Sequence, residues 1–402
     1  MKKDKKKKHA AWIRPRHAAA QWLLRVLASV YSRAVYRVRI TRYRDRRPCI
    51  VLMNHTTAFD QFFVALSLRR NVYFVSSEDV LSNGLISRFL QYTVAPIAIK
   101  KSANDARAVL NCLRVAREGG SIVMAPEGNR TYSGRTGHIK QTVAPLCRAL
   151  KLPILLFRIE GGYGVFPRWS DKARRGRMTA GVSRVLEPEE YLGMSDDALC
   201  EEICRGLYVD EAVDSGSFSG KRRAEYLERA IYWCPRCGFS RLESHGNLFT
   251  CRDCGLTVRY GEDTVLSGVG APAPYRFVAE WYEAQSRAML AADLTPYREV
   301  PLFTDAAGLY TTEIFKRRTC LAKRVTLAVY SDRFTVDLGG DLLVLPFCDI
   351  LAVTVLGHNK LNIYYGGKVY QLKADKRFCA LKYMNVYYKQ KEDKEDGEFL
   401  GI

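Results

Sequence analysis

Short apolar segments alternate with amphipathic helical patterns over the first half of the chain. Apolar runs of this length, bounded by polar residues, are typical of strands that are buried on both faces of a parallel sheet. The expected strands are CIVLM (49–53), NVYFVS (71–76), PIAI (96–99), SIVMA (121–125) and LPILLFRI (152–159), with helices around 59–69 and from about 104 to 118. The pattern predicts an α/β domain at 49–215, with a mostly parallel sheet flanked by helices and the charged stretch 187–223 as its exit.

An amphipathic helical stripe precedes this domain. Between residues 21 and 38, apolar residues recur every three to four positions, while Arg25, Arg33 and Arg37 occupy another row. This spacing predicts a helix with a cationic face. Such a helix can lie in a membrane interface or pack on its own domain. We assign residues 1–48 to a basic tail and a membrane-surface helix.

The last hundred residues consist of short strands separated by turns. The expected strands are VTLAVY, RFTVDL, LLVLPF, DILAVTVL, KLNIYY and KVYQL, with glycine pairs at 339–340 and 366–367 as turn signals. A final helix places Phe378, Leu381, Met384 and Tyr388 at helical spacing. We therefore expect a small antiparallel β domain at 300–392, closed by a C-terminal helix, whose topology resembles pleckstrin-homology-like domains. Further helices are expected near 221–233 and after Pro272 and Pro274.

Positive charge is concentrated at the N-terminus. Residues 1–50 carry 16 Lys and Arg against two Asp, which accounts for +14 of the formal net charge of +21. A basic segment of this kind suits an anionic membrane surface, where each cation contributes about 1 kcal/mol. Nucleic acid would attract it equally well, and a solvated tail is the third possibility.

Targeting signals and membrane spans are not evident. No run of about 18 or more apolar residues occurs, so a transmembrane helix is not expected. The segment 22–30 does not fit a signal peptide, because Arg25 interrupts it and no clear cleavage site follows. We therefore expect a cytoplasmic protein that binds peripherally to the inner face of the membrane.

Candidate catalytic residues lie just after the strand expected at 49–53. The segment IVLMNHTTAFDQFF places His55 and Asp60 where functional residues of α/β sheets gather. On a regular helix, five residues span about 500°, so the two side chains would point about 140° apart. They can meet only if His55 precedes the helix and Asp60 lies in its first turns, with Thr56 or Thr57 as plausible N-caps. Asp60 could then accept a hydrogen bond from one imidazole nitrogen and leave the other free to take a proton.

Two further strand ends carry charge. One strand ends at Pro126 and passes into Glu127, Gly128, Asn129 and Arg130, while another ends at Lys100 and Lys101. Glycine allows a ligand to approach the backbone, and arginine suits phosphate through charge-assisted hydrogen bonds. Together with His55 and Asp60, these residues predict a site that deprotonates a group attached to an anion.

The order of these blocks resembles the glycerolipid acyltransferase family that includes the 1-acylglycerol-3-phosphate acyltransferases. The resemblance covers roughly residues 20–210 through Asn54-His55-x4-Asp60, the 97–101 block, Pro126 to Arg130 and Leu152-Pro153-Ile154. Asn129 stands where the family usually has threonine, and Lys101 where it usually has arginine. These departures leave the chemistry intact and concern residues expected to bind the acceptor.

The resemblance implies a reaction and a role for each residue. His55, oriented by Asp60, would deprotonate a hydroxyl of a lysophosphatidic acid-type acceptor, which attacks an acyl thioester of coenzyme A or acyl carrier protein. Lys101 and Arg130 would bind the acceptor phosphate, and Glu127 would position the acceptor or Arg130. Asn54 and Gly128 complete the expected substrate-binding set. Acylation of another lysophospholipid is the nearest alternative.

Four of the twelve cysteines form two CxxC pairs, and the other eight lie mostly inside apolar runs. Cys234-Pro-Arg-Cys237-Gly and Cys251-Arg-Asp-Cys254-Gly are separated by thirteen residues, as in a zinc ribbon with four thiolate ligands. A redox dithiol would need only one pair. We expect structural zinc in a ribbon at 230–260.

Two other classes of function fit part of the sequence. The basic charge and the ribbon would suit a nucleic-acid-binding protein, but that reading leaves the His55/Asp60 and Glu127/Arg130 blocks without a role. A non-catalytic lipid-binding scaffold is disfavoured because His55 and Asp60 are both present. We therefore expect an O-acyltransferase of phospholipid biosynthesis that binds no nucleic acid.

Overall fold

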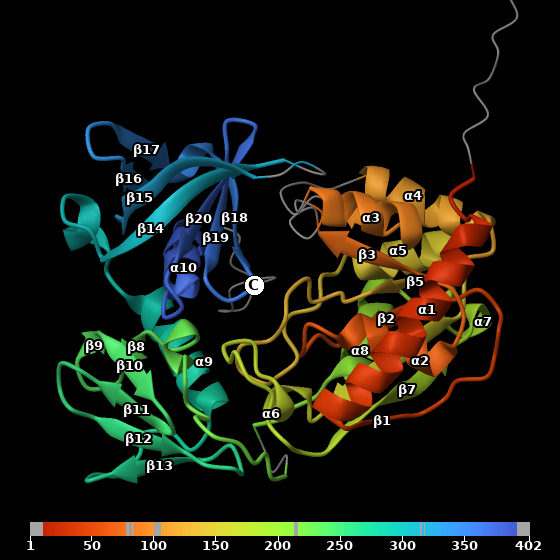
Figure 1. Ribbon diagram of the computed structural model, residues 1–402, viewed down its shortest axis with the longest axis horizontal. Helices are drawn as coiled ribbons and strands as arrows, with labels where there is room; N and C mark the ends of the chain where they lie inside the picture. The colour runs from red at the N-terminus through yellow and green to blue at the C-terminus, as the bar shows by residue number, and fades with distance from the viewer. Residues whose placement is uncertain are drawn as a thin grey trace, which may run out of the picture.

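The computed structural model describes residues 11–77, 81, 84–99, 106–212, 216–313, 316 and 318–391. A helix-covered sheet from the first half of the chain lies beside a group of antiparallel sheets from the second half (Figure 1). The basic tail at 2–8 and the predicted phosphate ligand Lys101 lie outside the described residues.

Seven strands form the central sheet of the first half, in the order β1-β7-β6-β2-β5-β3-β4. They are β1 (Val38–Ile40), β2 (Ile50–Met53), β3 (Val72–Ser77), β4 (Ile97–Ile99), β5 (Ser121–Met124), β6 (Ile154–Glu160) and β7 (Met178–Leu186). The five strands from β4 to β6 are parallel, whereas β7 pairs antiparallel with β6 and parallel with β1. The mostly parallel sheet is confirmed, and β1 and β7 are strands that the apolar runs did not predict.

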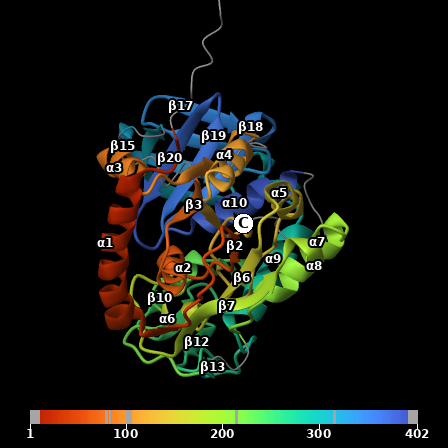
Figure 2. The ribbon, with the colours of Figure 1, turned by 90° about the vertical axis from the view of Figure 1, so that its right-hand side faces the viewer.

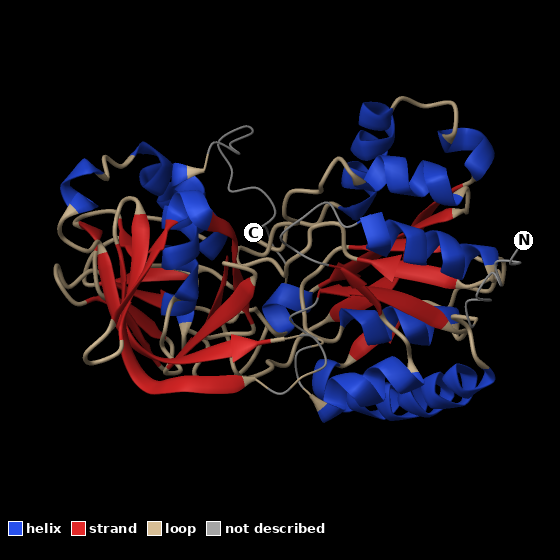
Figure 3. Cartoon of the chain, turned by 90° about the horizontal axis from the view of Figure 1, so that it is seen from above, coloured by secondary structure: helices blue, strands red, loops and turns tan. Residues whose placement is uncertain are grey.

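Helices cover both faces of this sheet (Figure 3). They are α1 (Pro15–Tyr31), α2 (Asp60–Leu68), α3 (Leu85–Thr93), α4 (Ala106–Arg117), α5 (Val143–Leu150), α6 (Gly162–Val165), α7 (Pro188–Tyr191) and α8 (Asp196–Leu207). All four residues of β2 are buried: Ile50 and Leu52 join the core under α4, α5 and α8, and Val51 joins the core that contains Phe63 of α2. Because successive strand residues point to opposite faces, a strand covered on both faces needs apolar residues throughout.

The prediction that residues 187–223 lead out of the α/β domain was wrong for the first part of this segment. Helix α8 packs on β2, β6 and α5, and its Leu199, Ile203 and Leu207 are buried in the core. Its charged residues occupy the outer face of the same helix, as Glu201 and Arg205 do. The segment 187–207 therefore belongs to the α/β domain, since its charge reflects an amphipathic helix and not a linker.

The predicted amphipathic helix forms as α1, which runs along one edge of the molecule (Figure 2). It begins at Pro15 and continues into a π-helical turn (Ser32–Tyr36) that ends at Arg37 in the left-handed region. The buried Gln21 binds both backbone groups of Val72 at the start of β3, at 2.9 and 3.1 Å. Among the described residues, no helix has the length and apolar character that crossing a bilayer requires.

Two small sheets and a long helix follow the α/β domain. The strands are β8 (Trp233–Cys234), β9 (Gly238–Phe239), β10 (Leu242–His245), β11 (Leu248–Cys251), β12 (Thr257–Tyr260) and β13 (Leu266–Val269), followed by α9 (Val278–Ala291). The prediction of a helix near 221–233 was wrong, because only a 3-10 turn (Leu227–Arg229) forms there. Arg222 and Tyr226 adopt the left-handed conformation, which ends a right-handed helix.

The C-terminal region is a seven-stranded antiparallel sheet with the order β17-β16-β15-β14-β20-β19-β18. Its strands are β14 (Phe303–Thr312), β15 (Thr319–Val329), β16 (Arg333–Asp337), β17 (Leu342–Pro346), β18 (Ile350–Leu356), β19 (Lys360–Tyr365) and β20 (Lys368–Ala374), and α10 (Ala380–Gln390) packs on β18 and β19. The predicted antiparallel sheet and closing helix are confirmed, and β14 is an addition.

The two halves of the molecule share one hydrophobic core. Tyr132, Tyr163 and Trp169 of the α/β domain are buried in the same cluster as residues of the cysteine module and the C-terminal sheet. Tyr132 also stacks on Tyr282 of α9, with ring centroids 6.3 Å apart. The segment that follows Glu127-Gly128-Asn129-Arg130 is thus packed against the second half of the chain.

Candidate active site

His55 and Asp60 meet at the carboxyl end of β2. His55 lies in the turn after the strand, and Asp60 is the first residue of α2. His55 Nδ1 lies 2.8 Å from Asp60 Oδ2, and the histidine side chain is 23% exposed whereas the Asp60 side chain is fully buried. The predicted placement of the pair, with the histidine before the helix and the aspartate in its first turn, is confirmed.

The Asp60 carboxylate is held by the turn itself. It accepts hydrogen bonds from the backbone N–H groups of Thr56 and Thr57, at 2.7 and 2.9 Å, and from the Thr57 hydroxyl at 2.6 Å. The predicted N-cap role of the threonines was wrong, because Phe59 is the N-cap residue and no side chain caps the helix. A carboxylate oxygen can only accept at this contact, so the Asp60 carboxylate selects the imidazole tautomer with the proton on Nδ1. Nε2 then carries the lone pair.

Glu127 links the histidine turn to the next loop. Its Oε1 accepts the N–H of His55 at 2.6 Å, and its Oε2 accepts the N–H of Gly137 at 2.7 Å. The Thr131 N–H also donates to the His55 carbonyl at 3.0 Å. Burial raises the pKa of Glu127 to about 8, although both N–H donors oppose this shift. Glu127 therefore positions the backbone of His55, whereas the sequence suggested contacts with the acceptor or Arg130.

Asn54 and Gly128 occupy different surroundings. The buried amide of Asn54 makes two hydrogen bonds of 2.8 Å to the backbone of Ile159, so it joins the end of β2 to β6. Gly128 is exposed in the left-handed conformation, and a Cβ there would meet nothing within 4 Å. The backbone at Gly128 is thus open to an approaching ligand, while both polar groups of the Asn54 side chain bind protein.

Arg130 supplies the positive charge of the site. Burial and the neighbouring Arg168 lower the pKa of Arg130 to about 10, whereas Asp60 acts in the opposite direction. Within the described ranges, no hydrogen bond or ion pair is recorded for its guanidinium. A half-buried guanidinium without a carboxylate partner favours an anionic ligand.

Arg168 was not among the residues that the sequence singled out. Its guanidinium donates to the carbonyl of Arg130 at 2.8 Å and to the carbonyl of Val355 in β18 at 3.1 Å, and it lies over the Tyr132 ring at 4.1 Å. The side chain is only 4% exposed. Arg168 therefore joins the Arg130 loop to the C-terminal sheet. Arg168 and Val355 are 187 positions apart in the sequence, so no local sequence pattern could predict this contact.

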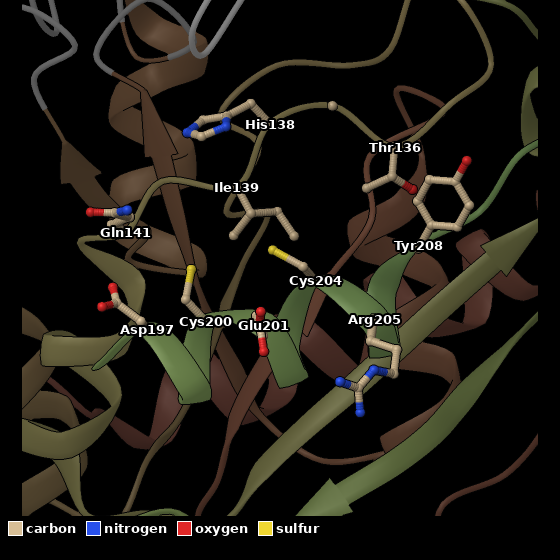
Figure 4. Close-up of a pocket in the computed structure, with 11 residues that line it drawn as sticks. Thr136, His138, Ile139, Gln141, Asp197, Cys200, Glu201, Cys204, Arg205 and Tyr208 are labelled. Atoms are coloured by element: carbon tan, nitrogen blue, oxygen red, sulfur yellow. The ribbon is translucent and has the colours of Figure 1, made fainter. Parts of the chain in front are cut away.

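A pocket of about 630 Å³ lies between the segment 136–141 and α8 (Figure 4). Its lining comprises Thr136, Gly137, His138, Ile139, Gln141, Asp197, Cys200, Glu201, Cys204, Arg205 and Tyr208. His55 is not part of this lining. The pocket borders the site only through Gly137, whose N–H holds Glu127.

The four predicted metal ligands converge as expected. The sulfur atoms of Cys234, Cys237, Cys251 and Cys254 all lie within 4.8 Å of one another. The Cys234–Cys254 and Cys237–Cys251 separations are 3.7 and 3.5 Å. Tetrahedral zinc with bonds of about 2.3 Å places its sulfur ligands about 3.8 Å apart, so the cluster fits this ion. Both CxxC pairs contribute to one cluster, which disfavours a redox dithiol.

The comparison with protein families follows the same residues. Residues 35–160, from the π-helical turn after α1 to the end of β6, match the family model described as Acyltransferase. This part of the chain thus resembles acyltransferases. The match includes the His55/Asp60 pair, Glu127 and Arg130, and it ends before Arg168, the cysteine module and the C-terminal sheet.

Two curated plant proteins resemble the same region. A chloroplastic 1-acyl-sn-glycerol-3-phosphate acyltransferase of Brassica napus is 24% identical over 156 residues, which cover 39% of this chain and 44% of the relative. One of Arabidopsis thaliana is 26% identical over 159 residues, which cover 39% of this chain and 42% of the relative. The chain thus spans less than half the length of these relatives.

A solved structure also resembles part of the chain. It is the 1-acyl-sn-glycerophosphate acyltransferase PlsC from Thermotoga maritima, which is 17% identical. The superposition has a TM-score of 0.40 and covers 48% of this chain and 80% of that protein.

Proposed function

We propose that the protein transfers a fatty acyl group from a thioester of coenzyme A or acyl carrier protein to the free hydroxyl of a lysophosphatidic acid-type acceptor. The observation that carries this proposal is the 2.8 Å contact between His55 Nδ1 and Asp60, near the half-buried guanidinium of Arg130. The family match and the activity of the two plant relatives support it. The first alternative is another lysophospholipid acceptor.

The proposed reaction needs one base and no covalent enzyme intermediate. Nε2 of His55 takes the proton of the acceptor hydroxyl while the oxygen attacks the thioester carbonyl. When the tetrahedral intermediate collapses, the carbon–sulfur bond breaks and the thiolate leaves with the proton from Nε2. Asp60 stabilises the imidazolium that forms between these steps. Arg130 holds the acceptor phosphate, and Glu127 keeps the His55 backbone in place.

Acyl transfer can be measured directly. Labelled acyl groups are supplied on coenzyme A and on acyl carrier protein, with lysophosphatidic acid in vesicles as acceptor, and labelled phosphatidic acid is followed over time. Turnover with one of the donors is expected. Folded protein that acylates none of a panel of lysophospholipids with either donor would contradict the proposed activity.

Arg168 is expected to act as a positioning residue in this reaction. Arg168→Met removes its hydrogen bonds to the carbonyls of Arg130 and Val355, and each hydrogen bond to a charged group contributes about 1.5–3 kcal/mol. We expect the KM for the acceptor to rise about tenfold with little change in kcat, because the anion-binding loop loosens. Steady-state kinetics over a range of acceptor concentrations measures this.

Arg174 provides the matched control for Arg168. It is equally buried, lies over the Trp169 ring at 5.0 Å and binds the Arg223 carbonyl at 2.6 Å, but it does not contact Arg130. Arg174→Met should lower the thermal stability as Arg168→Met does and leave the acceptor KM unchanged. Equal changes in KM for the two variants would mean that Arg168 is merely structural.

Peripheral membrane binding is the second part of the proposal. Helices α1 and α3 pack side by side (Figure 2). The Arg16 guanidinium lies over the Tyr92 ring at 3.9 Å, and both helices expose large apolar side chains. On α1 these are Trp22, Leu23, Val26, Leu27 and Val30, and on α3 they are Leu85, Ile86, Phe89 and Tyr92. Apolar helix faces flanked by arginines are typical of interfacial helices. The exposed residues of α3 extend the surface that the sequence indicated for α1 alone.

The membrane role of α3 can be tested with two polar substitutions. Leu85 and Phe89 are 80% and 61% exposed, and burial of one such side chain contributes about 1.5–3 kcal/mol. We expect Leu85→Ser with Phe89→Ser to weaken vesicle binding at least about tenfold in a sedimentation assay. Leu342→Ser is the control, because Leu342 is 61% exposed on β17. An equal loss in the control, or none in either variant, would exclude α3 from the membrane contact.

A further inference from the structure

Lys360, at the start of β19, is a half-buried ammonium group surrounded by positive charge. Burial lowers the pKa of Lys360, and Arg318 and Lys373 lower it further. Among the described residues, no acidic group raises the pKa of Lys360. In the part of the chain that the structure describes, none of these three cations forms an ion pair or a hydrogen bond with a carboxylate.

The register of the sheet makes this arrangement unfavourable for the protein alone. Lys360 lies directly opposite Lys373 in the β19–β20 pairing. Like charges in directly opposed positions destabilise a sheet. Arg318 is held beside them, because its Nη1 lies 3.4 Å from Gln371 Oε1 and its guanidinium lies 4.8 Å from the Tyr310 ring. Lys360 is half-buried, whereas Lys373 and Arg318 are exposed. Three neighbouring cations without an acid partner among the described residues favour a bound anion.

One end of this cationic group lies next to the candidate active site. His358, two residues before Lys360, contacts Asp171 of the α/β domain at 2.8 Å. Val355 of β18 accepts the hydrogen bond from Arg168, which also binds the Arg130 carbonyl. The turn between β18 and β19 thus connects Lys360 to the proposed acceptor site.

The other end lies next to the exposed apolar helix α3. The N–H of Gly84, immediately before α3, donates to the carbonyl of Lys316 at 3.2 Å. Lys316 is two residues from Arg318 in the connection between β14 and β15. A cationic group beside apolar residues that face solvent suits a lipid, since the headgroup can bind the cations while the chains meet the apolar side chains.

We propose that Lys360, Lys373 and Arg318 form a phosphate-binding site on the C-terminal sheet that takes the headgroup of an anionic membrane lipid. Ammonium and guanidinium groups bind phosphate oxygens through charge-assisted hydrogen bonds. The site lies outside the segment matched by the acyltransferase family model. It would hold the C-terminal sheet against the membrane, and its occupation does not depend on acyl transfer.

Vesicle binding tests the proposal. The site variant combines Lys360→Gln, Lys373→Gln and Arg318→Gln, and the control combines Lys323→Gln, Arg324→Gln and Lys368→Gln, which neutralise three exposed cations of the same sheet. Binding is measured with phosphatidylcholine vesicles that do or do not contain phosphatidic acid. We expect the site variant to lose at least about tenfold more affinity for the anionic vesicles than the control, because the control removes the same number of surface charges. Equal losses would overturn the site and leave only general surface charge.

Two further measurements separate the remaining outcomes. Titration with coenzyme A, a soluble phosphate ester, identifies the source of the phosphate: loss of coenzyme A binding in the site variant with unchanged vesicle binding would overturn the lipid assignment. The melting temperature of Lys360→Gln should stay constant or rise, because an unpaired charge is removed. A clear fall would show that Lys360 stabilises the fold and would contradict an anion site. The His55→Ala variant should bind vesicles normally, so a failure of acyl transfer would not be mistaken for a failure of this site.

Discussion

Replacing His55 by alanine is expected to lower kcat for acyl transfer by about 10²–10⁴-fold, the usual contribution of a general base. The substitution removes Nε2, the group that takes the proton of the acceptor hydroxyl. The acceptor KM should change little, because Arg130 and Gly128 remain in place. Rates are compared under saturating donor and acceptor, with the melting temperature as a check that the variant is folded.

The control for this variant is His245→Ala. His245 is 72% exposed at the end of β10 and lies in the cysteine module, so its loss should leave kcat unchanged. A His55→Ala variant that retains at least half of the wild-type kcat would exclude His55 as the base. Asp60→Asn gives a second check, since an amide nitrogen would face the N–H groups of Thr56 and Thr57 and no longer select the Nδ1–H tautomer. A large fall in kcat is expected for it too, together with reduced stability.

The sequence predicted the geometry of one contact at a strand end. His55 and Asp60 had to meet across the start of a helix, and the geometry of a helical turn was enough to predict this. Arg130 and Gly128 followed from the same rule, since both come directly after a buried strand. The His55–Asp60 contact could be predicted because it depends on a few neighbouring residues, whereas the substrate-binding roles of Arg130 and Gly128 stay predictions.

The roles of Glu127, Asn54 and Arg168 depend on distant partners. Glu127 binds the N–H of a residue 72 positions away, and Asn54 binds the backbone of Ile159. From the sequence, a glutamate beside an expected anion site is interpreted as a ligand. In the structure, Glu127 is buried and accepts two backbone N–H groups, so it links two segments of the chain. Only the packing of β2, β5 and β6 against one another brings these groups together.

The strands that escaped prediction have weak patterns. Strand β7 exposes Arg184 and pairs with strands on both sides, so its residues show neither an apolar run nor strict alternation. Strand β14 contains Asp305, Ala306, Ala307 and Gly308, which have low strand propensity. Both form because neighbouring strands offer backbone partners. Pairing with neighbouring strands, and not local strand propensity, thus determines that β7 and β14 form.

Removing zinc is expected to have the largest effect on stability. Structural zinc sites contribute about 10–16 kcal/mol of apparent binding free energy in small domains. Cys234 and Cys251 are buried in the same hydrophobic core as Phe249, Trp281 and Tyr132. Without the metal, the cysteine module should unfold and expose this core. Metal content of purified protein and the melting temperature before and after chelation measure the effect.

The shared core also predicts a loss of acyl transfer when zinc is removed. Tyr132 is two residues from Arg130, and Arg168 lies on its ring, so unfolding of the module removes support from the anion-binding loop. We expect Cys251→Ser to lose zinc, to melt at a lower temperature and to show a raised acceptor KM. Cys348→Ser is the control, because Cys348 is exposed and lies outside the cluster. A zinc-free protein with the melting temperature and acceptor KM of the wild type would contradict this prediction. It would show that the four cysteines support neither the fold nor the site.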